Sequence, residues 1–208
     1  MNQYLFSWKP VAATVLLAAI LWFATFYFQW GVFWFKISGS ALVLATLSFI
    51  LQPVRHLGIR INFQTIMIGL ISAALLYFIF WAAKIVSVEV LPFAGEQIGA
   101  IYGKGEGTST WIIVLLLFFV TGPCEEIYWR GYLQRQLMVR FGGLFGWLLA
   151  AALYAGVHIS SGNLMLTGAA GVAGLYWGAM YWWLKDISPV IISHAIWSTF
   201  IFAVMPVP

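Results

Sequence analysis

Charged residues are scarce in this chain of 208 residues, which has ten Lys or Arg and six Asp or Glu, together 8% of the total. A soluble globular domain has about 25% charged residues. Here 63% of the residues are hydrophobic and the mean hydropathy is +0.95. These values exclude an ordinary soluble domain and predict an all-α polytopic membrane protein embedded in the lipid bilayer. The net charge of +4 is small, and we expect no nucleic-acid partner.

Other absences narrow the chemistry. The single cysteine, Cys124, excludes an intramolecular disulfide. The chain has no Gly-x-Ser-x-Gly sequence around a serine nucleophile, although Ser160, Ser161 and Ser198 are available. It also lacks the His-Glu-x-x-His pair typical of one class of zinc protease. The six acids and three histidines are therefore considered first as groups for acid–base chemistry.

Apolar runs of membrane-spanning length recur along the chain. A helix needs about 20 mostly apolar residues to cross a bilayer. We predict about seven transmembrane helices (six to eight), and we treat 1–208 as a single polytopic helical membrane domain whose motif-bearing part is at about 109–204. The predicted spans are roughly 11–28, 37–51, 64–86, 111–140, 144–159, 164–184 and 190–204. Segment 87–108 is too polar to span and is expected to be a loop with a short interfacial helix.

The distribution of basic residues favours one orientation. Cytoplasmic loops of membrane proteins carry an excess of Lys and Arg. With a cytoplasmic N-terminus and seven spans, most of the basic residues face the cytoplasm. The cytoplasmic set is Lys9, Arg55, Arg60, Arg135, Arg140 and Lys185, against Lys36, Lys84 and Lys104 on the other side. We therefore expect an integral membrane protein with its N-terminus in the cytoplasm.

An acidic pair stands directly behind a run of ten apolar residues, 111–120. Glu125 and Glu126 are followed by Arg130, and a charge at the centre of a membrane helix costs about 2.5–3.5 kcal/mol. The apolar run returns only about 0.3–0.6 kcal/mol per residue. The three charges must therefore lie near an interface, or be paired and turned towards a protein interior or a wet cavity.

Spacing favours pairing of these charges. Glu126 and Arg130 are four residues apart on one helix face, with the acid on the favourable N-terminal side. Glu125 is rotated by about 100° from Glu126 and can point elsewhere. A cluster of charges where a helix leaves the bilayer remains the alternative.

Two histidines also stand in predicted spans. Glu125 lies seventeen residues before Gly142 and His158 sixteen after it (142 − 125 and 158 − 142), so an antiparallel hairpin puts both at similar depth. His194 and Ser198 are one turn apart on a single face. An intramembrane histidine can equally be an ordinary interhelical contact, but two of them with an acidic pair favour a site.

These residues suggest water-using chemistry. A carboxylate beside an imidazole, such as Glu125 with His158, can activate water as a general base. A second imidazole with a hydroxyl, His194 with Ser198, can stabilise an oxyanion. Alternatively, Glu125, His158 and His194 are three ligands of a zinc ion with one open position.

The acidic cluster also resembles a known motif. Glu125-Glu126-x-x-x-Arg130, with Trp129 before the arginine and Gly131 after it, is similar to the first motif of the CPBP family. That family comprises the CAAX prenyl endopeptidases of the Rce1 type and bacterial relatives, including proteins labelled abortive-infection or bacteriocin-processing.

Two further motifs follow in the family's order. Tyr154-x-x-x-His158 stands where the family has Phe-x-x-x-His, and His194-x-x-x-Ser198 stands where it has His-x-x-x-Asn. The resemblance covers about the last hundred residues. The chain departs from the pattern at Tyr154, which carries an added hydroxyl, and at Ser198, which replaces an amide.

The resemblance implies a glutamate-type intramembrane endopeptidase that needs no cofactor and no metal. It makes Glu125 the catalytic base, assisted by His158, with Glu126 and Arg130 as supporting residues. His194 and Ser198 would form the oxyanion hole.

The resemblance also implies a substrate and a location. A membrane-anchored protein or peptide would be the substrate, in a bacterial or archaeal cell membrane. Two alternatives stay open: a non-catalytic immunity or scaffold protein on the same fold, favoured by Ser198, and a zinc-dependent membrane hydrolase.

The predicted orientation can be tested by single-cysteine labelling in a Cys124→Ala background. We expect cysteines at positions 55 and 140 to react with a membrane-impermeant thiol reagent only after the cells are opened. A cysteine at position 106 should react in intact cells, because Glu106 is predicted outside. Labelling of positions 55 and 140 from outside would contradict this orientation.

Overall fold

The computed structural model describes residues 7–52 and 57–206, so the predicted loop positions Arg55 and His56 lie outside the described residues. The described ranges consist of helices and short connections and contain no β-strand. The all-α prediction is therefore confirmed.

The helices follow the predicted spans closely. The N-terminal half contains α1 (Trp8–Tyr27), α2 (Phe33–Leu51), α3 (Phe63–Val90) and α4 (Ala94–Tyr102). A long rod follows, made of α5 (Thr110–Leu116), a π-helical segment η3 (Leu117–Thr121), α6 (Gly122–Glu126), a second π-helical segment η4 (Ile127–Gln134) and α7 (Arg135–Phe141). The last elements are α8 (Gly143–His158), the short η5 (Ile159–Ser161), α9 (Leu164–Leu184), α10 (Ser188–Thr199) and the π-helical η6 (Phe200–Val204).

Length and composition support membrane spanning by most of these segments. Five are long and apolar enough to cross a bilayer: Trp8–Tyr27, Phe33–Leu51, Phe63–Val90, Thr110–Phe141 and Gly143–Ser161. The apolar helix Ser188–Val204 is shorter. Helix α9 has 21 residues but is not among the helices that are apolar enough to span, within the part of the chain that the structure describes. The seven predicted ranges thus coincide with helices, and five of these helices meet both criteria.

The polar segment 87–108 contains the expected short helix. Helix α3 runs on to Val90, and α4 then lies across the end of α9. Gln97 joins the two helices: its carbonyl accepts from Asn163 Nδ2 at 2.8 Å and its Oε1 accepts from the Met165 amide at 3.0 Å. This loop therefore closes one end of the helical bundle.

The rod 110–141 stays helical through the Gly122-Pro123 pair. Proline removes one backbone hydrogen bond, and the structure has π-helical turns at Leu117–Thr121, immediately before it. Such turns are a usual place for a helix to bend. Gly122 also allows close packing, since a Cβ there would lie 3.0 Å from Ala195 Cα in α10.

Small residues bring α8 and α9 together. A Cβ on Gly174 would lie 3.3 Å from Ala151 Cα, and one on Gly178 would lie 2.6 Å from the Trp147 side chain. Small residues allow close approach of helices in lipid. The stripe Ala170, Gly174 and Gly178 is therefore used for packing inside the chain.

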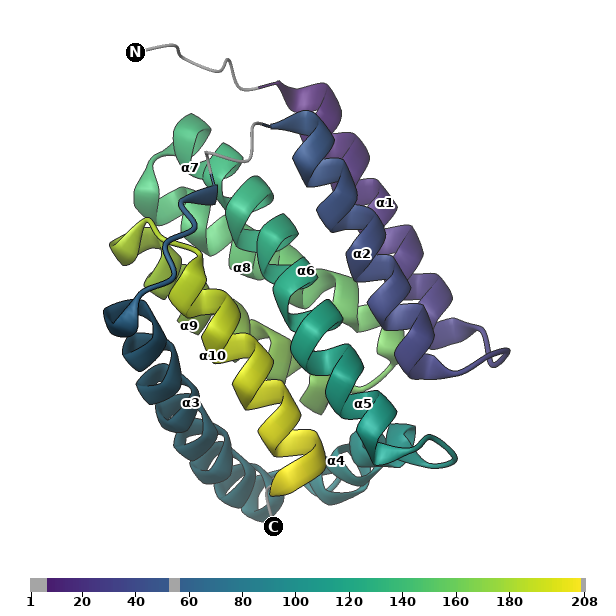
Figure 1. The fold of residues 1–208 in the computed structure, drawn as a ribbon. Coiled ribbons are helices and arrows are strands. Elements are labelled where there is room, and N and C mark those ends of the chain that lie inside the picture. The colour runs from purple at the N-terminus through teal and green to yellow at the C-terminus, as the bar shows by residue number, and fades with distance from the viewer. Residues whose placement is uncertain (1–6, 53–56, 207–208) are drawn as a thin grey trace.

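The acid-bearing rod lies in the middle of the molecule. Figure 1 shows α5 and α6 running between α2 and α10, with α8 behind them. Helix α10 packs against α3 and α6, and α2 packs against α6. Arg130 is among the largest fully buried side chains, together with Trp22, Trp129 and Trp177. The predicted site residues thus lie buried inside the bundle.

Gly146 gives a test of the α7–α8 contact. Gly142, with φ of 82°, makes the turn between these helices, and a Cβ on Gly146 would lie 2.7 Å from the Leu137 carbonyl carbon. We expect Gly146→Ala to destabilise the protein by about 1–3 kcal/mol, the usual cost of overpacking. Thermal unfolding in detergent would measure it.

The matched control is Gly156→Ala in the same helix, where a Cβ would meet nothing within 4 Å. It should be neutral or stabilising by up to about 1 kcal/mol, because alanine is the better helix former. Equal unfolding temperatures for the two variants would contradict the close α7–α8 contact.

Candidate active site

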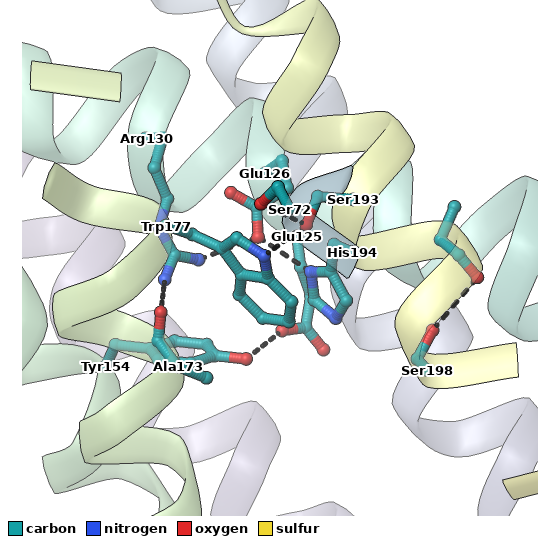
Figure 2. A network of polar contacts seen from close by, with 11 residues as sticks. Ser72, Glu125, Glu126, Arg130, Tyr154, Ala173, Trp177, Ser193, His194 and Ser198 are labelled. Carbon is teal, nitrogen blue, oxygen red and sulfur yellow. Dashed lines mark hydrogen bonds and ion pairs between the residues drawn. The ribbon is translucent and has the colours of Figure 1, made fainter. Parts of the chain in front are cut away.

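The supporting pair expected from spacing is present and buried. Arg130 Nη1 donates to Glu126 Oε1 at 2.8 Å, and the two residues are 1% and 0% exposed. Arg130 Nη2 also donates to the Ala173 carbonyl at 3.4 Å (Figure 2). The guanidinium lies over the rings of Tyr154 and Trp177, at 4.6 and 5.5 Å from their centroids. Contacts from three helical segments thus fix the arginine.

Glu126 also binds a histidine from another helix. His194 Nδ1 lies 2.7 Å from the same Glu126 Oε1 that accepts from Arg130. Because a carboxylate paired with arginine only accepts hydrogen bonds, Nδ1 carries the proton. The imidazole stacks on Trp177 at 3.9 Å between centroids, and Trp177 Nε1 donates to Ser193 at 3.0 Å. His194 is therefore held at one nitrogen and on one face.

Glu125 points to the other side of His194. Its Oε2 accepts a hydrogen bond from the Tyr154 hydroxyl at 2.7 Å, and the residue is 5% exposed. Figure 2 shows His194 between the two carboxylates, with the Glu125 carboxylate beside the Tyr154 hydroxyl. The expectation that the two glutamates point at different groups agrees with this geometry.

His158 is hydrogen-bonded at both ring nitrogens. Its Nδ1 lies 2.8 Å from the Tyr154 carbonyl, and its Nε2 lies 3.2 Å from Trp22 Nε1. A carbonyl can only accept and an indole N–H can only donate, so His158 is the neutral tautomer with its proton on Nδ1. Tyr154 connects His158 to Glu125, through its carbonyl on one side and its hydroxyl on the other.

Ser198 stands apart from this cluster. Its hydroxyl donates to the Ala195 carbonyl of its own helix at 3.4 Å. Figure 2 shows it directed away from His194 and the carboxylates. The structure thus brings Glu125, Glu126, Arg130 and His194 together, joins His158 to them through Tyr154, and leaves Ser198 outside.

An apolar cavity of about 580 Å³ opens beside the cluster. Tyr154, His158 and His194 line one part of its wall. Side chains of α3, α4, α9 and η6 line the rest, and Lys84 and Ser87 are polar members of that wall. The Glu125 carboxylate does not line the cavity itself. It accepts a hydrogen bond from the hydroxyl of Tyr154, which does line it. A long apolar ligand entering this cavity would reach the polar cluster.

Comparison with known families agrees with this arrangement. Residues 107–200 match the family described as type II CAAX prenyl endopeptidase Rce1-like. We refer to this segment as the Rce1-like domain, after the family that it resembles. It covers 94 of the 208 residues (200 − 107 + 1) and contains all the predicted site residues. Searches of curated proteins and of solved structures return no match.

The geometry of the Rce1-like domain gives no support to the zinc alternative. Among the residues that the structure describes, no group of three or more His, Cys, Asp or Glu is placed to hold a metal ion. Glu125 bonds to the Tyr154 hydroxyl, His194 bonds to Glu126, and both nitrogens of His158 are taken by the Tyr154 carbonyl and the Trp22 indole.

Sequence reasoning missed three aromatic side chains around the Rce1-like site. The Tyr154 hydroxyl could have been found, because Tyr154 and His158 are four residues apart and share one helix face. Trp177 and Trp22 come from distant helices and carry no local signal. Trp22 is also outside the matched segment, in α1.

The buried pair of the Rce1-like domain should be sensitive to loss of one partner. Arg130→Met leaves Glu126 without its arginine, and breaking a buried pair costs about 3–5 kcal/mol. We expect a lower folded yield in detergent, measured by size-exclusion chromatography. The double variant Arg130→Met with Glu126→Gln should recover part of the yield.

Arg140→Met is the matched control, because Arg140 is exposed at the end of the same rod. It should fold like the wild type. A normal yield for Arg130→Met as well would mean that the pair contributes little to folding.

Proposed function

We propose that this chain is an intramembrane endopeptidase that uses Glu125, and no metal, to activate water. The Rce1-like match supports a membrane peptidase of the CAAX-protease type. The observation that carries the mechanism is the Glu125 carboxylate, buried, held by Tyr154 and directly behind the wall of an apolar cavity. Ionisable groups held at such cost inside a membrane protein are functional by default.

The proposed reaction transfers one proton twice, first from water to Glu125 and then from Glu125 to the leaving nitrogen. The Glu125 carboxylate takes a proton from water while the water oxygen bonds to the substrate carbonyl carbon, and the carbonyl π electrons move onto the oxygen. The oxyanion then re-forms the carbonyl, the C–N bond breaks, and the leaving nitrogen takes the proton from Glu125. The products are a new carboxyl terminus and an amine, and Glu125 returns to its starting state.

The other site residues have distinct proposed roles. Glu126 and Arg130 fix the orientation of His194, whose ring lines the cavity beside Glu125. His194 is assigned a part in stabilising the oxyanion, for which its ring must carry a second proton on Nε2. His158 is a second basic group on the same wall, and its Nε2 reaches a water only when the hydrogen bond from Trp22 opens.

The cavity fits a substrate that is apolar along most of its length. Its wall is built mainly from aliphatic and aromatic side chains. A membrane-anchored protein or peptide, with an apolar segment or a lipid-modified residue next to the cleaved bond, suits this lining. The family description names prenylated CAAX sequences, so a farnesylated peptide is the first probe to use.

Glu125→Gln tests the proposed base. The amide keeps the size of the side chain and an acceptor for the Tyr154 hydroxyl, so the fold should persist. Cleavage should fall by about 10²–10⁴-fold, the usual contribution of a positioned base. The assay uses internally quenched peptides ending in Cys-Val-Val-Ser, with and without an S-farnesyl group, together with mass spectrometry of membrane-protein termini in cells with and without the chain.

Glu106→Gln is the matched control, since Glu106 is exposed in the loop before α5. It should cleave like the wild type. Chelators should have no effect, and metal analysis of the purified wild type should find no stoichiometric zinc. Full activity of Glu125→Gln would end the glutamate mechanism, and one zinc per chain with loss of activity on chelation would replace it with a metal mechanism.

A further inference from the structure

The Tyr154 hydroxyl has no role in the mechanism so far, although it donates directly to the Glu125 carboxylate. We propose that Tyr154 is a further catalytic residue, whose hydroxyl donates a hydrogen bond to the oxyanion of the tetrahedral intermediate. Tyr154 would then take the oxyanion-stabilising role that the family resemblance implies for Ser198. The inference rests on the proposed peptidase function.

The position of Tyr154 supports this role. Its hydroxyl lies 2.7 Å from Glu125 Oε2, and its side chain lines the cavity while only 6% exposed. The Arg130 guanidinium lies 4.6 Å from the ring centroid, and the Trp129 ring meets it edge-on at 5.1 Å. The phenol is therefore held in place before any substrate arrives, as a donor to a transition state should be.

The alternative donors are less suitable. The Ser198 hydroxyl is turned to the Ala195 carbonyl, and Ser198 is not part of the cavity wall. His194 uses the proton on Nδ1 for Glu126, so it can donate from Nε2 only when it is doubly protonated. A phenol donates in its ordinary neutral form and needs no second proton to do so. Among these three groups, Tyr154 alone combines a neutral donor with a place on the cavity wall.

During the reaction, the hydrogen bond donated by Tyr154 would move from the Glu125 carboxyl group to the oxyanion of the substrate. At rest the hydroxyl donates to Glu125 Oε2, which is ionised in the proposed mechanism. When Glu125 takes the proton from water, its carboxyl group becomes neutral and a weaker acceptor. At the same moment negative charge appears on the substrate carbonyl oxygen, next to the water that Glu125 activates. The phenol keeps its own proton and turns its hydrogen bond from the carboxyl group to the oxyanion.

Tyr154→Phe removes this hydroxyl and keeps the ring that packs against Arg130 and Trp129. We expect kcat for the cleaved peptide to fall by about 10²–10³-fold, the range for loss of one oxyanion donor. KM should stay within about threefold, because the lost interaction is made only in the transition state. Ser198→Ala should change kcat by less than about threefold, since its hydroxyl bonds only to its own helix.

Tyr176→Phe is the matched control. The Tyr176 hydroxyl is also hydrogen-bonded between helices, to the Ser72 carbonyl at 3.1 Å, but it does not line the cavity. It should leave kcat unchanged, so that a loss in Tyr154→Phe cannot come from removal of any interhelical hydroxyl. Thermal unfolding of each variant in detergent checks the fold.

The pH dependence of kcat distinguishes a Tyr154 that donates to the oxyanion from one that only positions Glu125. If Tyr154 is the oxyanion donor, the plateau of kcat against pH falls in Tyr154→Phe. If the hydroxyl only stabilises the ionised form of Glu125, the acidic limb moves to higher pH and the plateau keeps its wild-type height. That second result, or a large loss in Ser198→Ala, would overturn the proposal.

A second variant covers the case in which Tyr154→Phe does not fold. Fluorotyrosine placed at position 154 keeps the ring and the hydroxyl and makes the phenol a stronger donor. Below the pH at which that phenol ionises, kcat should change with its acidity, and an unchanged kcat would overturn the proposal. Failure of the inference is distinct from failure of the function: in the first case Tyr154→Phe cleaves normally while Glu125→Gln does not. In the second case Glu125→Gln cleaves like the wild type, or the wild type itself cleaves neither peptide.

Discussion

One carboxylate oxygen organises the interior of this protein. Glu126 Oε1 accepts from Arg130 on its own helical rod and from His194 on α10, so two cationic or polar groups share one partner. A single charge at the centre of a membrane helix costs about 2.5–3.5 kcal/mol. The pairing offsets that cost and also fixes the rotation of α10 relative to the rod. The second oxygen, Oε2, is buried without a partner, which leaves Glu126 under-satisfied in an otherwise bonded cluster.

The π-helical backbone around the motif depends on side chains from other helices. Carbonyls with weakened helical bonds need other donors at membrane depth, where water is absent. Gln52, at the end of α2, donates to the Gly131 carbonyl at 2.9 Å, and Arg135 in turn donates to Gln52 at 3.2 Å. Irregular helical turns of this kind are frequent at functional sites. Here the π-helical turns carry Arg130, and the contacts of Gln52 with Gly131 and with Arg135 hold these turns in place.

Local patterns were enough to predict much of this structure. Apolar runs located the helices, and the four-residue spacing of Glu126 and Arg130 predicted their pair, because both signals lie within one helix. Counting residues from Gly142 put Glu125 and His158 at similar depth, and both do contact Tyr154. Sequence could not give the rotation of one helix about its axis relative to another.

That rotation decides which groups meet. It directs His194 to Glu126 and turns Ser198 away, although the two residues are only one helical turn apart. It also brings the Trp22 indole to His158 from the other end of the sequence. Spacing within a helix carries no information on either contact.

The hydrogen bond from the Trp22 indole to His158 decides which fragments of the chain keep the complete cluster. Trp22 belongs to α1, whereas the Rce1-like match begins at residue 107. A fragment that starts there would keep every charged member of the cluster and still lack the group that caps His158 Nε2. Expression of the matched segment alone would therefore yield a chemically altered site, and domain swaps among relatives should carry α1 along.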